Sequence, residues 1–139
     1  MAVVEICERC VLVVDDNPLM RRVYKSFLKA AGFSVYCAAN GREGIEVLKR
    51  NKSNIIAIVL DYCMPGLNGK ETAELMNEIN SSIPKILISG SLGELSQMPW
   101  LKTLFNGALQ KPHQAEECIE LIRRLTGSNV LPGLESGLG

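Results

Sequence analysis

The sequence predicts an α/β fold in which helices cover both faces of a doubly wound parallel sheet of five strands. Short apolar runs alternate five times with segments whose apolar residues recur at helical spacing. One run is apolar from residue 55 to residue 60, as expected of a strand that is covered on both faces. Strands that alternate with helices along a chain favour parallel pairing and right-handed crossovers.

The first half of the chain supplies three strands and two helices. The strands are predicted at residues 10–14, 33–38 and 54–60. Asn17 and Pro18 mark the start of the first helix, because Asn caps a helix and Pro suits its first position, and Gly32 ends it. Between them, apolar residues recur at helical spacing and form one stripe: Met20, Val23, Tyr24, Phe27, Leu28 and Ala31. Asn40, followed three residues later by Glu43, predicts a capped second helix that runs to residue 51.

The second half repeats the alternation less regularly. The predicted elements are a helix at 70–79, a strand at 84–89, a helical segment at 91–105, a short edge strand at 108–110 and a helix at 113–125. Pro99 lies inside the segment 91–105, and proline cannot continue a helix without loss of a hydrogen bond. We therefore expect five helices in all, with the fourth poorly regular.

The length and composition indicate one globular domain. We predict a leader at residues 1–9, a domain at 10–126 and a flexible tail at 127–139, which is rich in Gly and Ser and has no helical stripe. A chain of 139 residues fits one domain with a real core. Apolar residues at 47% and charged residues at 22% are typical of a soluble protein.

The charges balance, since Lys+Arg and Asp+Glu are both 15. This balance argues against a nucleic-acid partner, which requires a basic face, although a sum does not exclude a local patch. No apolar run approaches the roughly 18 residues of a spanning helix, and no secretory signal precedes the domain. The sequence therefore predicts a cytoplasmic protein with no membrane partner and no direct nucleic-acid partner.

The cysteine pattern favours reduced thiols. The five cysteines are Cys7, Cys10, Cys37, Cys63 and Cys118, an odd number with irregular spacing. Cys7 and Cys10 form a C-x-x-C, but there is no second pair, and the single histidine, His113, is distant in the sequence. Zinc or redox chemistry is therefore the less favoured reading, and we expect a leader whose Cys10 begins the first strand.

Polar side chains follow the predicted strands where each one ends. Asp15 and Asp16 end the first strand, Asp61 the third, Ser89 the fourth, and Gln110 with Lys111 the fifth. In an open α/β sheet, ligands bind beyond the carboxyl ends of the strands, where the strand order reverses. A single acid at a strand end is usually a helix cap or a solvated charge, but three carboxylates, a hydroxyl and an ammonium at the strand ends of one topology favour a common site.

The chemistry of these groups points to phosphoryl transfer. Three crowded carboxylates repel one another, and a divalent cation relieves that repulsion. Oxygen ligands without histidine or thiol suit Mg²⁺. A hydroxyl at Ser89 and an ammonium at Lys111 are suited to a phosphoryl group. We therefore predict Mg²⁺-dependent transfer of a phosphoryl group to an aspartate.

Four segments carry a family resemblance. "VLVVDDNPLMRR", "LDYCMPGLNG", "ILISG" and "LQKP" resemble, in order and spacing, the signatures of the response-regulator receiver domain of two-component signalling. The similarity covers residues 10–126. It implies a flavodoxin-like fold with strand order 2-1-3-4-5. "ILISG" with "GALQKP" further resembles the receivers of hybrid sensor kinases.

The resemblance assigns a role to each matching position. Asp61 corresponds to the phosphoacceptor, and Ser89 and Lys111 to the groups that contact the phosphoryl group. The metal ligands would be Asp15, Asp16, Asp61 and the backbone carbonyl of Cys63. The bond between Lys111 and Pro112 would be cis, and Gly90 would leave space beside the site.

The implied function is a signalling switch. The phosphoryl donor would be a histidine kinase or a histidine phosphotransfer protein, and the output a homodimer or another protein partner. The domain would catalyse its own phosphorylation and dephosphorylation rather than turn over a small molecule. Ala108 replaces the Tyr or Phe that often precedes the lysine by three residues, so the usual movement of that ring cannot relay the signal here.

Two alternatives remain open. A pseudo-receiver would bind partners without being phosphorylated, although all the acids, the hydroxyl and the lysine are present. A phosphatase with an aspartyl nucleophile would also use Asp and Mg²⁺ on an α/β sheet, but such enzymes carry D-x-D after the first strand, where this chain has D-D-N-P.

Overall fold

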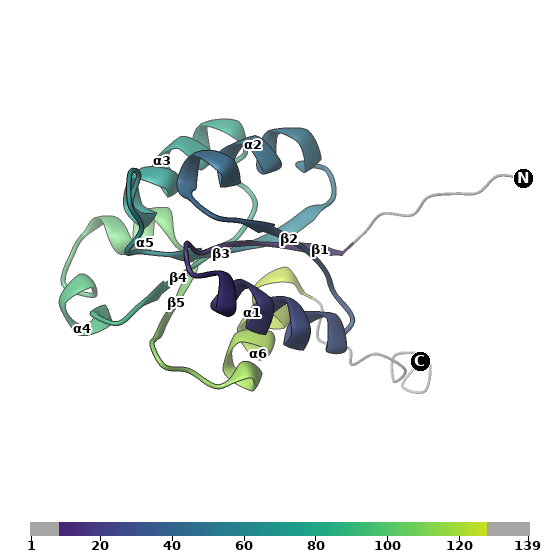
Figure 1. The fold of residues 1–139 in the computed structure, drawn as a ribbon. Coiled ribbons are helices and arrows are strands. Elements are labelled where there is room, and N and C mark those ends of the chain that lie inside the picture. Colours follow the sequence, from purple (N-terminus) through teal and green to yellow (C-terminus); the bar gives the residue numbers. More distant parts are fainter. Residues whose placement is uncertain (1–8, 128–139) are drawn as a thin grey trace, which may run out of the picture.

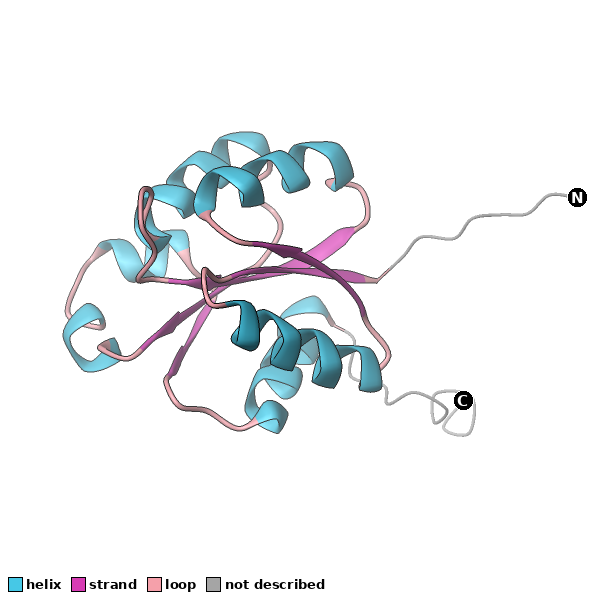
Figure 2. Cartoon of the chain, in the orientation of Figure 1, coloured by secondary structure: helices cyan, strands magenta, loops and turns pink. Residues whose placement is uncertain are grey.

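The computed structural model describes residues 9–127, which form one parallel sheet flanked by helices (Figures 1 and 2). The strands are β1 (Cys10–Val14), β2 (Ser34–Ala38), β3 (Ile55–Asp61), β4 (Lys85–Ser89) and β5 (Gly107–Gln110). They lie side by side in the order β2-β1-β3-β4-β5, and each pair of neighbours is parallel. The predicted fold class and strand order are confirmed.

The helices form two layers on the sheet. They are α1 (Pro18–Ala30), α2 (Gly41–Asn51), α3 (Gly69–Ile79), α4 (Leu92–Leu95), α5 (Trp100–Leu104) and α6 (Ala115–Thr126). In Figure 1, α2, α3 and α5 cover one face, and α1 and α6 cover the other. Alternate residues of β1 enter the two cores: Leu12 packs on the α2–α3 side and Val13 on the α1–α6 side.

Side-chain caps fix where the helices begin. Asn17 accepts hydrogen bonds from the backbone N–H groups of Leu19 and Met20, as predicted for the start of α1. Asn40 caps α2 by accepting from the N–H of Glu43, which was also predicted. A third cap at Asn68, which forms a reciprocal capping box with Glu71 at the start of α3, was not predicted.

The number of helices is a correction, because the described chain has six helices rather than five. The segment 91–105 is divided into α4 and α5. Pro99 has no N–H to donate to an earlier carbonyl, and its ring would clash with the carbonyl of Leu95 in a continuous helix. The last helix begins at Ala115 rather than residue 113, because the backbone of Gln114 is extended.

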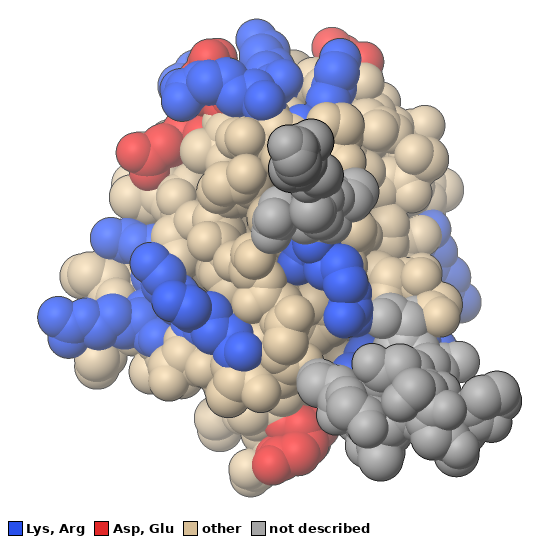
Figure 3. All heavy atoms as spheres, turned by 90° about the vertical axis from the view of Figure 1, so that its right-hand side faces the viewer, with Lys and Arg blue, Asp and Glu red and all other residues tan. Residues whose placement is uncertain are grey.

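Charge is distributed unevenly over the surface despite the neutral sum. The end of the sheet where the strands begin faces the viewer in Figure 3, and blue Lys and Arg side chains predominate there over red Asp and Glu. The described chain also enters at Arg9 and leaves at Gly127 on this side (Figure 1). Residues 1–8 of the predicted leader (1–9) and residues 128–139 of the predicted tail (127–139) lie outside the described residues.

Candidate functional site

The three predicted acids converge at the carboxyl end of the sheet. Asp15 follows β1 and Asp61 ends β3, and these strands are neighbours at the point where the strand order reverses. One carboxylate oxygen each from Asp15, Asp16 and Asp61 lies within 4.8 Å of the others. Asp15 and Asp61 are only 2% and 3% exposed, whereas Asp16 faces solvent. Two of the three charges are therefore withdrawn from water.

Lys111 forms the direct cationic contact to this cluster. Its ammonium Nζ lies 2.9 Å from Oδ1 of Asp61. Its backbone N–H donates to the carbonyl of Ser89 over 2.8 Å, which joins the ends of β4 and β5. The bond between Lys111 and Pro112 is cis, as the family resemblance implied.

Ser89 is buried at the end of β4, beside the strand that carries Asp61. Its hydroxyl oxygen accepts a hydrogen bond from the backbone N–H of Ser91 over 2.9 Å. Because a hydroxyl group both donates and accepts hydrogen bonds, the O–H of Ser89 remains available to donate to a ligand.

Burial dominates the electrostatics of the acids. Desolvation raises the pKa of Asp61, although the hydrogen bond from Lys111 opposes that shift, and desolvation raises the pKa of Asp15. Burial alone would lower the pKa of Lys111, but the hydrogen bond and charge of Asp61 outweigh it and raise that pKa. One ammonium therefore does not offset three carboxylates, and a divalent cation fits this donor set.

Side-chain contacts that were not predicted from the sequence hold the site in shape. Arg21 donates from Nη1 to the backbone carbonyl of Asp15 over 2.7 Å, and a carboxylate oxygen of Asp15 accepts from the N–H of Asn17. Gln110 donates to the carbonyl of Gly90 and accepts from the N–H of Leu92. Arg21 lies within the quoted motif "VLVVDDNPLMRR", so its position was visible although its contact was not.

The loop after Asp61 closes tightly on α3. The N–H of Gly69 donates to the carbonyl of Tyr62 over 2.8 Å. A Cβ atom at Gly69 would lie 2.8 Å from Cα of Tyr62 and 2.9 Å from the carbonyl oxygen of Asp61, so no side chain fits. Cys63 lies in this loop with an exposed side chain. The predicted role of its carbonyl as a metal ligand stays a prediction.

Two aromatic arrangements lie near the site. Tyr62 stacks on Trp100 of α5 with ring centroids 6.1 Å apart, and Ala108 packs against the same core. On the other side, the hydroxyl of Tyr24 and Nε2 of His113 are 2.7 Å apart. His113 thus lies just before α6, held by α1, rather than among the acids.

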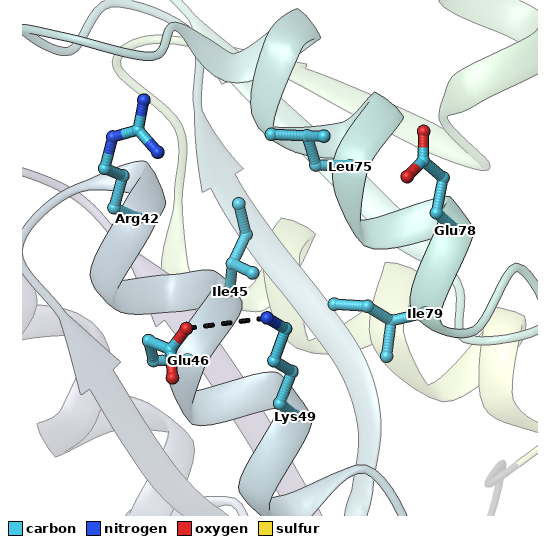
Figure 4. A pocket seen from close by; sticks show the side chains of 7 residues that line it. All are labelled: Arg42, Ile45, Glu46, Lys49, Leu75, Glu78 and Ile79. Carbon is cyan, nitrogen blue, oxygen red and sulfur yellow. Dashed lines mark ion pairs between the residues drawn. The ribbon is translucent and has the colours of Figure 1, made fainter.

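A separate hollow of about 610 Å³ lies between α2 and α3 (Figure 4). Ile45, Leu75 and Ile79 form its apolar floor. On its rim, Lys49 and Glu46 form an ion pair at 3.6 Å, and both side chains are more than half exposed. Its polar groups do not converge on one point, so the acidic end of the sheet is the better candidate site.

The fold and the site together define a class: a flavodoxin-like, doubly wound α/β domain with an acidic cluster at its strand-order reversal. The sequence matches the response regulator receiver domain family over residues 11–123. The chain therefore belongs to the response regulator receiver domain family.

Individual proteins agree with this membership. The chain is 31% identical over 102 residues to the autoinducer 1 sensor kinase/phosphatase LuxN of Vibrio campbellii, covering 73% of this chain and 12% of LuxN. It is 28% identical over 115 residues to the response regulator MprA of Mycolicibacterium vanbaalenii, covering 83% of this chain and 49% of MprA. The chain thus spans about half or less of these relatives.

Solved structures match the whole sheet. A receiver domain protein from Clostridium thermocellum superposes with a TM-score of 0.80 at 24% identity, covering 86% of this chain and 94% of that one. CheY of Borrelia burgdorferi, in a complex with CheX, BeF3 and Mg, superposes with a TM-score of 0.78 at 23% identity, covering 84% and 88% of the two chains. At these identities the likeness shows the fold.

Proposed function

We propose that the chain is a phosphoacceptor switch in which Asp61 receives a phosphoryl group from a phosphohistidine. The observation that carries this proposal is the 2.9 Å contact between Lys111 and Asp61 beside two further carboxylates. Burying an unpaired carboxylate is costly. The carboxylate of Asp61 is paired with Lys111, and its place at the end of a rigid strand directs it toward one point outside the sheet. Such an arrangement suits a nucleophile better than a structural charge.

The transfer follows from the positions of these groups. An oxygen of Asp61 attacks phosphorus and forms an O–P bond, while the P–N bond of phosphohistidine breaks and its electron pair stays on the imidazole. The ammonium of Lys111 then pairs with a phosphoryl oxygen, and the O–H of Ser89 donates to another. In a separate step, water attacks phosphorus, the O–P bond to Asp61 breaks, and inorganic phosphate leaves while the carboxylate is restored.

Mg²⁺ is the proposed cofactor. Asp15, Asp16, Asp61 and the carbonyl of Cys63 would hold it. When bound, it would offset the negative charge of the phosphoryl oxygens. The Borrelia burgdorferi CheY complex contains Mg and BeF3, which supports the same chemistry for this domain.

A macromolecular donor fits the surface beside the site. A groove of about 390 Å³ runs between α1 and the segment before α6, and Met20, Val23, Phe27 and Pro112 contribute apolar lining next to Lys111. Val23 is 42% exposed although it belongs to the predicted apolar stripe. A histidine kinase or phosphotransfer protein would cover this groove in a cytoplasmic encounter.

Within residues 9–127, every helix is too short or too polar to span a membrane.

The test is phosphorylation by a small phosphodonor. Incubation with acetyl phosphate and Mg²⁺ should add the mass of one phosphoryl group to the intact chain. Asp61→Asn should abolish the gain, whereas Glu94→Gln, which removes an exposed acid of α4, should retain it. A chelator should suppress the gain in the wild type.

Two results would reject the proposal in favour of its alternatives. A wild-type chain that gains no mass with either small or phosphohistidine donors would be a pseudo-receiver. A chain that turns over a free phosphomonoester would be a phosphatase of the aspartyl-nucleophile class.

A further inference from the structure

The sheet has a basic end that the neutral total charge conceals. Seven cations lie where the strands begin, just before β1 or around the last turns of α1, α2 and α6: Arg9, Lys29, Lys49, Arg50, Lys52, Arg123 and Arg124. All but Arg123 are exposed. In the last turns of α1, α2, α3 and α6, one residue is acidic, Glu78 of α3. Figure 3 shows this face, where basic side chains predominate.

The opposite end is acidic. Asp15, Asp16 and Asp61 lie there with Glu43, Glu71, Glu94, Glu116 and Glu117 of the first helical turns, and these acids outnumber the cations Arg21, Arg42, Lys70 and Lys111 at the same end. The described domain is therefore an electrostatic dipole along the strands. Its positive end is remote from Asp61.

Helix termini explain only part of this pattern. A cation in the last turn interacts favourably with the negative end of its own helix, and α1, α2 and α6 each have such cations. The end of α2 has three, Lys49, Arg50 and Lys52, and α3 has no cation in its last turn. Lys49 pairs with Glu46 at 3.6 Å, while the side chains of Arg50 and Lys52 extend into solvent without an ion pair to any residue of 9–127.

We propose that this basic end binds an anionic membrane surface. The cations are spread over three helix ends and the start of β1, rather than gathered in a groove. Clusters of four to eight Lys or Arg side chains attract anionic headgroups, and a fluid lipid surface can meet cations that are scattered and flexible. The proposal is independent of phosphorylation and revises the expectation, drawn from the lack of a long apolar run, that the protein has no membrane partner.

Nucleic acid fits this end less well. Single-stranded nucleic acids stack their bases on aromatic side chains, and none of the seven Phe, Trp and Tyr side chains, all within residues 24–105, is exposed. The described basic end also presents helix C-termini rather than a helix or β-ribbon that could enter the major groove of a duplex.

Binding through this end would orient the domain. The acidic end would point away from the lipid because its charge is repelled by anionic headgroups. The Asp61 crevice and the groove beside Lys111 would then remain open to a protein donor. Membrane attachment and phosphorylation are therefore compatible in one molecule.

The test is sedimentation of the full chain with lipid vesicles. At about 0.1 M salt, where the Debye length is about 10 Å, the chain should sediment with vesicles that contain about one-third phosphatidylglycerol. It should stay in solution with pure phosphatidylcholine vesicles, and salt of about 0.5 M should release it. Vesicle-bound chain should accept a phosphoryl group from acetyl phosphate as fast as free chain.

A matched pair of double variants locates the surface. Arg50→Gln with Lys52→Gln should weaken the partition onto anionic vesicles by about tenfold or more. Lys70→Gln with Lys102→Gln, which removes the same charge from α3 and α5, should change it less than about threefold, and circular dichroism should show both variants folded.

Several results would overturn the proposal that the basic end binds a membrane. Failure to sediment with anionic vesicles at about 0.1 M salt, or equal losses in the two double variants, would overturn the proposal. Tighter binding to duplex DNA or to polyglutamate than to the vesicles would overturn it in favour of that partner. None of these binding measurements depends on whether Asp61 is phosphorylated.

Discussion

The two ends of the sheet both bury charge, but they treat it differently. Where the strands end, Asp61 is buried with a cation at 2.9 Å, and the loops around it are tied by Arg21, Gln110 and Gly69. Where the strands begin, Lys85 is 1% exposed, and its ammonium donates to one carbonyl, that of Ile83, over 3.0 Å. Burial of a charge therefore indicates a functional site when other polar groups converge on that charge.

Backbone crowding separates the two ends most sharply. Gly69→Ala should lower the free energy of unfolding by about 2 to 3 kcal/mol, because its Cβ would meet backbone atoms of Tyr62 and Asp61 at under 3 Å. At the opposite end, a Cβ at Gly107 would meet Leu121 Cδ2 at 2.9 Å, which is the movable tip of a side chain. Gly107→Ala should therefore cost less than about 1 kcal/mol.

Urea denaturation of both variants measures this difference. Phosphorylation by acetyl phosphate should also slow in Gly69→Ala, because the loop that follows the acceptor must shift, and should be unchanged in Gly107→Ala. Equal stability losses in the two variants would show that the loop after β3 is no more constrained than the start of β5.

The buried acid should destabilise the metal-free protein at neutral pH. Burial raises the pKa of Asp61 above its ordinary value of 3.8, so the folded state holds that proton more tightly than the unfolded state. Stability should therefore fall as pH rises from that value through the folded pKa. At pH 7 without metal, Asp61→Asn should therefore raise the unfolding free energy.

Thermal melts with and without Mg²⁺ provide the measurement. Mg²⁺ should raise the Tm of the wild type by mass action and have a much smaller effect on Asp61→Asn. The control is Asp16→Asn, an exposed carboxylate whose loss should change metal-free stability by less than about 0.5 kcal/mol. A less stable Asp61→Asn in the absence of metal would indicate that the pair with Lys111 outweighs burial.

Lys85, where the strands begin, provides a second test of a buried charge, and its effect on stability should be smaller. Desolvation lowers its pKa, so stability should rise with pH between the folded value and 10.5. Lys85→Met keeps the stem and removes the buried charge, and it should stabilise the protein by about 1 kcal/mol. Lys102→Met, at an exposed position of α5, should lie within about 0.5 kcal/mol of the wild type. Destabilisation by Lys85→Met would show that its contact with Ile83 is essential.

Local rules were enough to predict most of the fold. The apolar run that became β3 and the caps at Asn17 and Asn40 depend on neighbouring residues, and the structure confirms them. The break at Pro99 was anticipated as irregularity, but the division into α4 and α5 depends on how each short helix packs on the sheet. Val23 belongs to the predicted apolar stripe of the first helix, yet its side chain is 42% exposed. Helical periodicity shows which residues share a face, but it does not show how far the neighbouring elements cover that face.

The site was predictable in its acids but not in its supports. Strand ends can be located in a sequence, so the convergence of Asp15, Asp16 and Asp61 followed from topology. The contacts of Arg21 and Gln110 join positions that carry no periodic signal, and they emerge only in three dimensions. The need for glycine at 69 likewise comes from the close approach of another segment.

The smallest predicted effect concerns how the acidic end reaches α5. Tyr62 directly follows Asp61 and stacks on Trp100 with rings 12° from parallel, while Ala108 leaves no ring on β5 to move. A double-mutant cycle with Tyr62→Leu and Trp100→Leu should give a coupling of about 0.5 to 1 kcal/mol in the unphosphorylated protein.

Phosphorylation should change that coupling, because the backbone of Tyr62 is attached to the acceptor residue. Trp100 is the single tryptophan, so its emission should shift when beryllofluoride and Mg²⁺ are added, and the shift should shrink in Tyr62→Leu. Asp61→Asn serves as the control that must show no shift. An emission change that persists unaltered in Tyr62→Leu would mean that α5 senses the site through β4 and β5, since Ser89 and Lys111 also join those strands at the acidic end.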